Sequence, residues 1–293
     1  MGHYFFQKPN KMRIKILLFI VLLIGCNEDD FRKQIAVDSK IVVEGEIEEG
    51  DVAKVLLSFS VPIGATIDST TILKYVIRSA KVTISDGEKE EVLRLKRDNK
   101  RIPPFIYLGS TIIGEVGKKY TLKVVYLNKK VEATTSIPHS VPISSASYIK
   151  DNLTDKSGYV HIKFNDPVNE KNFYQVSTLL DKHDSLFIPA IYGNLSDDNF
   201  TNSEVSIQIF RGKSFSFEDH SDYKPNFEDG DLIYIKLRTM NKVGFDFWNS
   251  WQNESVNGQS PIFPNTTSLK SNINGGIGIW EGYGQQTIRL KAE

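Results

Sequence analysis

From residue 35 onward, apolar and polar residues alternate with a period of two along most of the chain. The stretches 119–127, 159–164 and 231–237 each place apolar side chains on one face and polar ones on the other. Such alternation is typical of strands with one buried and one solvated face. The same reasoning predicts strands over 39–47, 51–59, 80–85, 90–96, 130–136, 173–180, 203–210 and 285–291. Many short strands separated by turn residues predict a β-sandwich or barrel.

The segment 136–143 contains two prolines, Pro138 and Pro142. Each lacks an N–H donor and favours an extended conformation in the preceding residue, which makes a stiff connector. We therefore expect an all-β fold of two β-sandwich domains. The first would be an immunoglobulin-like sandwich over 37–137, the linker would be 138–142, and the second β domain would cover 143–293.

One segment departs from the period of two. Residues 241–254 carry Val243, Phe247, Trp248 and Trp251 at helical spacing, which predicts a short aromatic helix near the C-terminus. The preferred interpretation is a helix that buries its aromatic face on the second domain, and the alternative is a ligand platform formed by the two tryptophans. Further on, Gly275, Gly276 and Gly278 indicate a bulge or a close backbone approach beside the last strand.

The N-terminal region contains nine consecutive apolar residues, 16–24, preceded by Arg13 and Lys15. A helix needs about 20 apolar residues to span a bilayer. A run of only nine apolar residues after basic ones indicates a secretory signal instead. Gly25 and the chain's single cysteine follow, and 23–26 resembles a bacterial lipobox. This resemblance implies that the chain is cleaved before Cys26 and that a lipid is attached to the sulfur of this cysteine. It also implies that the new amino terminus is acylated, with palmitate as the acyl chain. Residues 1–25 would be the signal peptide, with 1–11 as an upstream extension.

An acidic run, Asn27, Glu28, Asp29 and Asp30, follows the cysteine directly. It resembles the export signal that directs lipoproteins of Bacteroidota to the outer face of the outer membrane. The alternative is a solvated acidic linker. In either interpretation, residues 26–36 form a lipidated acidic tether.

Several segments together resemble one known family. They occur in this order: 40–47, 80–86, 117–124, 164–174, the aromatic segment and 271–280. Behind a lipobox, this series resembles the Bacteroidota outer-membrane lipoproteins classified as domain of unknown function 4249. Members are often encoded beside TonB-dependent transporters, which implies an accessory role in nutrient uptake. The family offers no catalytic residues to transfer to this chain.

The remaining sequence features lead us to expect a protein that has no catalytic activity and binds no cofactor. The chain contains 36 lysine and arginine residues and 36 aspartate and glutamate residues. It therefore lacks the excess of basic residues that would indicate a nucleic-acid partner. His183 and His220 have acidic neighbours, but adjacent strand residues point to opposite faces and do not form a triad. No metal is expected. The only candidates for a metal site are weak ones for calcium, which prefers oxygen ligands. They are the carboxylates of Asp219, Asp222, Asp229 and Asp231.

We therefore expect a surface-exposed outer-membrane lipoprotein that acts as a non-catalytic accessory or binding partner of a TonB-dependent β-barrel transporter. The alternatives are a structural or adhesive cell-surface protein and, third, a surface hydrolase. The ligand-binding residues are unassigned, and the loops 192–202 and 214–230 are the expected recognition surface.

The lipid anchor gives the first testable prediction. Radiolabelled palmitate should enter the wild-type product and should not enter the Cys26→Ala variant, because the new amino terminus is acylated only after cleavage at a lipidated cysteine. Labelling is measured by autoradiography after cell fractionation. Equal labelling of both proteins would contradict the anchor.

Overall fold

The computed structural model describes residues 39–61, 67–152, 156–168, 170–200, 203–213, 223–257 and 269–293. The expected signal peptide, Cys26, the acidic run 27–30 and the tether lie outside the described residues, as do Asp219, His220 and Asp222. Residues 39–293 form one compact unit, and everything below concerns that unit.

The unit consists mainly of short strands, as the alternating pattern predicts. The elements in chain order are β1 (Ile41–Glu48), β2 (Val52–Phe59), α3 (Ile72–Tyr75), β3 (Lys81–Ser85), β4 (Glu90–Val92), β5 (Arg94–Arg97), β6 (Phe105–Ile113), β7 (Lys119–Tyr126), β8 (Lys129–Ser136), β9 (Ile143–Lys150), β10 (Ser157–Asn165), β11 (Phe173–Leu180), β12 (Ile188–Ser196), the 3₁₀ turn η1 (Asp197–Asn199), β13 (Glu204–Ile209), β14 (Phe227–Glu228), β15 (Leu232–Met240), α4 (Lys242–Asn257) and β16 (Ile277–Lys291). The all-β class and the helix near the C-terminus are confirmed.

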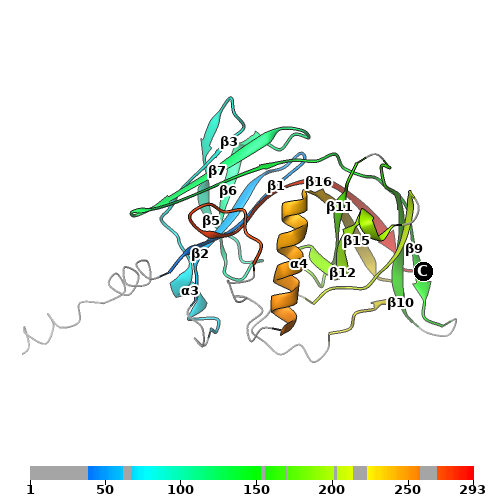
Figure 1. The fold of residues 1–293 in the computed structure, drawn as a ribbon. Coiled ribbons are helices and arrows are strands. Elements are labelled where there is room, and N and C mark those ends of the chain that lie inside the picture. Colours follow the sequence, from blue (N-terminus) through cyan, green and yellow to red (C-terminus); the bar gives the residue numbers. More distant parts are fainter. Residues whose placement is uncertain are drawn as a thin grey trace, which may run out of the picture. The chain divides into compact units, whose positions relative to one another are not determined.

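The described strands form three sheets (Figure 1). The largest has eight strands in the order β12-β11-β15-β16-β1-β2-β6-β5. A second sheet has the order β4-β3-β7-β8, and a third contains β13, β10 and β14, with β9 paired to β10. Most neighbours are antiparallel, but β1 and β16 run parallel.

The strand β16 joins the two ends of the chain. Its first part, 277–283, pairs with β1 in parallel, and its second part, 284–291, pairs with β15 in antiparallel orientation. A single sheet therefore runs across the division expected at 138–142. The C-terminal residues 277–283 complete the half of the sheet that contains the N-terminal strands.

Two hydrophobic cores lie on one face of the eight-stranded sheet. In the first, the sheet of β3 and β7 packs over β1, β2 and β6, and the rings of Phe59 and Tyr126 meet at 5.6 Å. Trp280 is fully buried there, and its indole N–H donates to the carbonyl of Tyr120 at 2.9 Å. In the second, the sheet of β9 and β10 covers β11, β15 and β16, with Phe164 against Tyr174. Each half is thus a sandwich of two sheets.

The proline-containing connector packs on β16. Ile137 and Val141 are buried, and a Cβ on Gly282 would lie 2.5 Å from the carbonyl oxygen of Ser136. The connector therefore lies against β16, with the buried side chains of Ile137 and Val141 anchoring it.

The expected close approach at the glycine-rich segment is confirmed. Gly278 has a φ of 116°, and a Cβ there would collide with the carbonyl of Val43 on β1. Glycine tolerates this backbone conformation and leaves room for the neighbouring strand. The glycine thus allows β16 to approach β1 closely.

The helix α4 is held by its aromatic face. Phe247 is buried, and the indole N–H of Trp248 donates to the hydroxyl of Tyr283 at 2.8 Å. Trp248 also packs against Phe173 and Met240 on the sheet. This agrees with the interpretation of a helix that covers the sheet. None of the helices in the described ranges is both long and apolar enough to cross a membrane.

Candidate functional site

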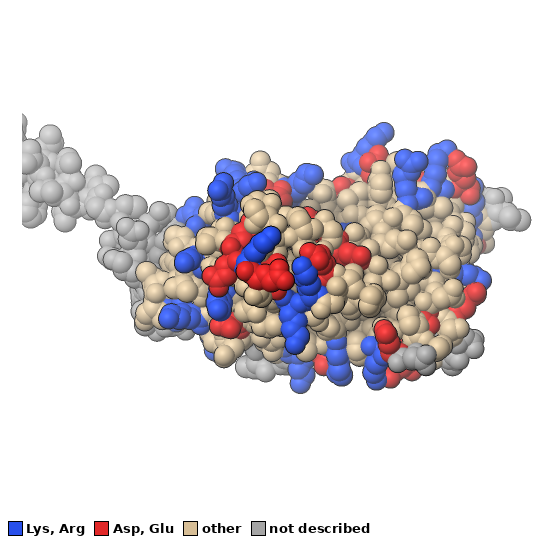
Figure 2. All heavy atoms as spheres, turned by 90° about the horizontal axis from the view of Figure 1, so that it is seen from above, with Lys and Arg blue, Asp and Glu red and all other residues tan. Residues whose placement is uncertain are grey.

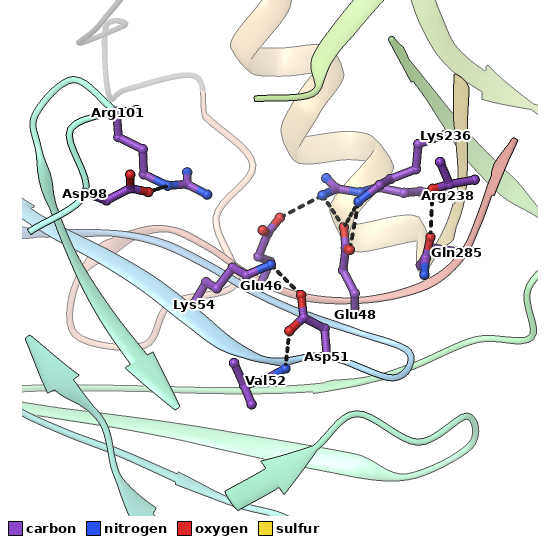
Figure 3. A network of polar contacts seen from close by, with 11 residues as sticks. Glu46, Glu48, Asp51, Val52, Lys54, Asp98, Arg101, Lys236, Arg238 and Gln285 are labelled. Atoms are coloured by element: carbon purple, nitrogen blue, oxygen red, sulfur yellow. Dashed lines mark hydrogen bonds and ion pairs between the residues drawn. The ribbon is translucent and has the colours of Figure 1, made fainter. Parts of the chain in front are cut away.

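Four charged residues meet on the face of the large sheet opposite the two cores (Figure 3). Glu46 and Glu48 alternate with buried Ile47 on β1, and Lys236 and Arg238 alternate with buried Leu237 on β15. Because side chains alternate between the faces of a strand, both pairs point to the same side. We call Glu46, Glu48, Lys236 and Arg238 the charged cluster.

The cluster is closely paired. The ammonium of Lys236 lies 2.9 Å from Oε2 of Glu48, and the guanidinium of Arg238 contacts Glu48 and lies 3.1 Å from Oε2 of Glu46. The side chains of Glu48, Lys236 and Arg238 are only 4%, 12% and 13% exposed. Both cations also lie over aromatic rings, Lys236 over Phe187 at 4.5 Å and Arg238 over Tyr283 at 4.6 Å.

The opposite charges around Glu48 and Arg238 keep these two groups ionised. Burial tends to raise the pKa of Glu48, but Arg238 and Lys236 outweigh it and lower the pKa to about 2. Burial opposes the charge on Arg238, yet Glu46 and Glu48 raise the pKa of its guanidinium. A carboxylate that stays ionised near neutral pH cannot donate a proton. The cluster therefore connects β1 to β15 through ion pairs, and Glu48 has no proton to donate near neutral pH.

A second buried carboxylate lies where β15 turns into α4. Oε1 of Glu281 accepts from the backbone N–H of Asn241 at 2.9 Å and from its side-chain amide at 2.7 Å. Burial raises the pKa of Glu281 to about 7, although the hydrogen bonds from Asn241 oppose that shift. Gly244, in the first turn of α4, packs directly on this carboxyl group. Glu281 is 1% exposed, so no substrate reaches it in this conformation.

An open cleft of about 340 Å³ lies where β1 ends beside β16. It is lined by Glu49, Ser140, Pro142, Gln285 and Gln286. Oε2 of Glu49 is buried and has no hydrogen-bond partner among the described residues. The cleft is therefore lined mainly by polar side chains, including the amides of Gln285 and Gln286.

The charges on the surface are mixed. On the face in Figure 2, acidic side chains gather near the middle and basic ones lie among and around them. A surface of this kind gives no broad field of one sign on that face, and it does not resemble a nucleic-acid interface.

The two described calcium candidates have protein partners. Asp229 lies 3.2 Å from the ammonium of Lys150, and Asp231 accepts from the backbone N–H of Glu228 at 2.8 Å. Within the described ranges, no group of three or more His, Cys, Asp or Glu residues is placed to hold a metal. Asp219 and Asp222 fall outside those ranges, so calcium binding stays untested.

One histidine in the described residues contacts a serine, but it is neither His183 nor His220, the two candidates from the sequence. Nε2 of His161 lies 2.9 Å from the hydroxyl of Ser206 on the neighbouring strand. His161 contacts no carboxylate in the part of the chain that the structure describes, so this pair lacks the third member of a triad. His183 is exposed in the turn after β11.

Sequence reasoning did not find the charged cluster or the cleft. The signal was present, because Glu46 and Glu48 alternate with buried residues on a strand, as do Lys236 and Arg238. What was missing was the pairing of β1 with β16, which brings these residues together.

The fold and this site define a β-sandwich protein with an ion-pair cluster and an open cleft. The sequence profile of one protein family, described as "Domain of unknown function (DUF4249)", matches residues 28–289. The chain belongs to this family.

Other comparisons add little. No curated protein matches the chain. Among solved structures, the chain is similar to a two fibronectin type-III domain segment from chicken tenascin, with 10% identity over 87% of this chain and 100% of that one. The TM-score is 0.23, and a likeness at this level carries no conclusion about fold or function.

We expect the charged cluster to lose much of its contribution to folding stability when the carboxylate of Glu48, its central acid, is neutralised. Glu48→Gln should lower the free energy of unfolding by about 3–5 kcal/mol, because it leaves buried cations without their counter-charge. The wild-type contribution is present above the ordinary glutamate pKa of 4.5 and is lost as the pH falls towards about 2. Urea unfolding at pH 7 measures it.

The matched control is Glu204→Gln, which removes the exposed ion pair with Lys163 at 3.0 Å. Its cost should stay below about 1 kcal/mol. Equal costs for the two variants would show that the buried cluster contributes no more than a surface pair.

The contribution of Glu281 to folding stability should depend on pH in the opposite direction from that of Glu48. Its raised pKa means that the folded state binds a proton more tightly than the unfolded state, so stability is highest below pH 4.5 and falls as the pH rises to about 7. The loss is on the order of 3 kcal/mol. Glu281→Gln keeps an acceptor for Asn241 and cannot ionise, so its melting temperature should fall less between pH 5 and 8. Parallel wild-type and variant curves would contradict this.

Proposed function

We propose that this protein is a lipoprotein of the bacterial outer membrane that faces the cell exterior in a member of the Bacteroidota. It is anchored by lipid on Cys26 and acts as a non-catalytic accessory or binding partner of a TonB-dependent transporter in nutrient uptake. The proposal rests on the lipobox-like residues 23–26 and on the acidic run that follows them. Both lie at or directly before the start of the family match at residue 28.

The observation that carries the non-catalytic role is the use of the buried charges. Glu48, Lys236 and Arg238 neutralise one another across the sheet, and Glu281 is enclosed between β16 and α4. Buried ionisable groups at catalytic sites face a cleft and keep a pKa near the working pH. Glu48 meets neither condition, and Glu281 does not face a cleft. This supports binding over chemistry.

Co-purification from the native membrane tests the partnership. The full chain with an affinity tag after Glu293 is expressed in its own organism, extracted from the outer membrane in mild detergent and recovered on resin. A TonB-dependent β-barrel protein should elute with it in near-equal amounts. The control is an unrelated tagged outer-membrane lipoprotein from the same cells. Recovery of no β-barrel protein, or of the same one with the control, would overturn the proposal.

A further inference from the structure

Among the described strands, none pairs with one edge of the second half of β16. Backbone groups of successive strand residues point alternately to the two sides. The carbonyl of Tyr283 accepts from the N–H of Glu49 on the β1 side, whereas Ala292 exchanges hydrogen bonds with Asp231 and Gly230 on the β15 side. The register between β15 and β16 runs without a shift from 284 to 291. The odd-numbered residues of this part therefore direct their N–H and C=O groups away from β15.

Four residues carry these groups: Gln285, Thr287, Arg289 and Lys291. The strand β1 ends at Glu48, opposite Tyr283, and in the described part of the chain no strand takes its place beyond that point. A row of free donors and acceptors on a sheet edge is a template for another strand. An added strand would continue the position of β1 in the sheet.

The two sides of this edge differ in chemistry. On the core side, Ile288 and Leu290 are only partly buried and pack at the margin of the second core. On the opposite side, Thr287 and Arg289 are exposed, and Arg289 forms no ion pair with any described residue. Lys291 is paired with Glu293. An added strand therefore meets apolar surface on one side and an unbalanced positive charge on the other.

The cleft described above lies at the start of this edge. Gln285 and Gln286 belong to both, and Glu49 also lines the cleft. The edge is seven residues long, which corresponds to about 23 Å of extended chain. The cleft, with the side-chain amides of Gln285 and Gln286, lies at one end, and Arg289 supplies a cation near the other.

We propose that the edge of β16 from Gln285 to Lys291 binds an extended peptide segment of a partner protein by strand addition. The segment alternates apolar side chains, which lie beside Ile288 and Leu290, with acidic ones, which lie beside Arg289. Main-chain hydrogen bonds give the affinity and the alternate side chains give the specificity.

A second copy of this chain fits the edge less well. Antiparallel self-pairing that uses the whole edge from 285 to 291 is centred on Ile288 and would place the two copies of Arg289 on diagonal positions, about 7–8 Å apart. No acidic side chain on either edge lies between them, so like charges would repel. The charge of the edge therefore favours an acidic segment.

The test uses the full chain in detergent and two synthetic probes. One is the acetylated and amidated peptide Thr-Val-Glu-Val-Glu-Val-Thr, and the other has lysine in place of both glutamates. Binding is measured by fluorescence anisotropy. The acidic peptide should bind, and the lysine peptide should bind at least about tenfold more weakly, because only the acidic side chains pair with Arg289.

Two matched pairs of variants locate the binding to the edge. Thr287→Pro removes an N–H that faces the open side and leaves the hydrogen bonds to β15 intact, so it should weaken binding about tenfold or more, while Thr287→Ala keeps the N–H and should bind normally. Arg289→Glu should reverse the preference between the two peptides, while Arg289→Gln should only abolish it. Circular dichroism and melting curves check that each variant is folded.

Several results would overturn the proposal. They are no binding of either peptide, equal binding of both, or binding that Thr287→Pro and Arg289→Glu leave unchanged. A concentration-dependent dimer in analytical ultracentrifugation that Thr287→Pro abolishes would assign the edge to self-association instead. None of these measurements involves the lipid anchor or a transporter, so failure here leaves the proposed function standing, and the reverse also holds.

Discussion

The parallel pairing of β1 with β16 is the contact on which the rest of this structure depends. It joins residues at the two ends of the folded unit, and it places β16 between strands from both halves of the chain. Without β16, the first core would lose Trp280, and β15 would lose one of its two neighbours in the sheet. The two sandwiches therefore share a structural strand and are not two modules connected only by a linker.

Polar interactions reinforce the same junction from the other face. The charged cluster lies across β16, with its acids on β1 and its bases on β15. Buried ion pairs of this kind add little net stability compared with apolar residues of equal size, but they penalise any arrangement that separates them. The cluster thus acts mainly on the register and relative placement of the strands. The connector, which packs on Gly282, restrains the junction further.

Local structure was largely predictable from the sequence, and long-range pairing was not. The alternation in 119–127 and 231–237 located β7 and β15 to within a few residues, because the period of two is a property of each strand alone. The helical spacing of Phe247, Trp248 and Trp251 located α4 in the same way. The partner of a strand depends on contacts that no local pattern contains. Glu46 and Arg238, for example, are separated by 192 positions.

The same limit explains the candidate site. Alternating glutamates at 46 and 48 were visible, as were the bases at 236 and 238, but only the strand order brings them together. The prolines at 138 and 142 predicted a stiff connector between two sets of strands. They could not indicate that the last strand would return across it, because that return depends on the fit of Trp280 and Gly278 against β1.

The wide separation of β1 and β16 in the sequence has a consequence for folding. The ribosome makes β1 before all the other described strands and β16 after them, so the large sheet cannot close until the whole stretch between them has been synthesised. Contacts between residues so far apart form slowly. Hairpins such as β7 with β8 pair residues that are close in sequence and form earlier, and the two sandwiches join only when β16 pairs with both.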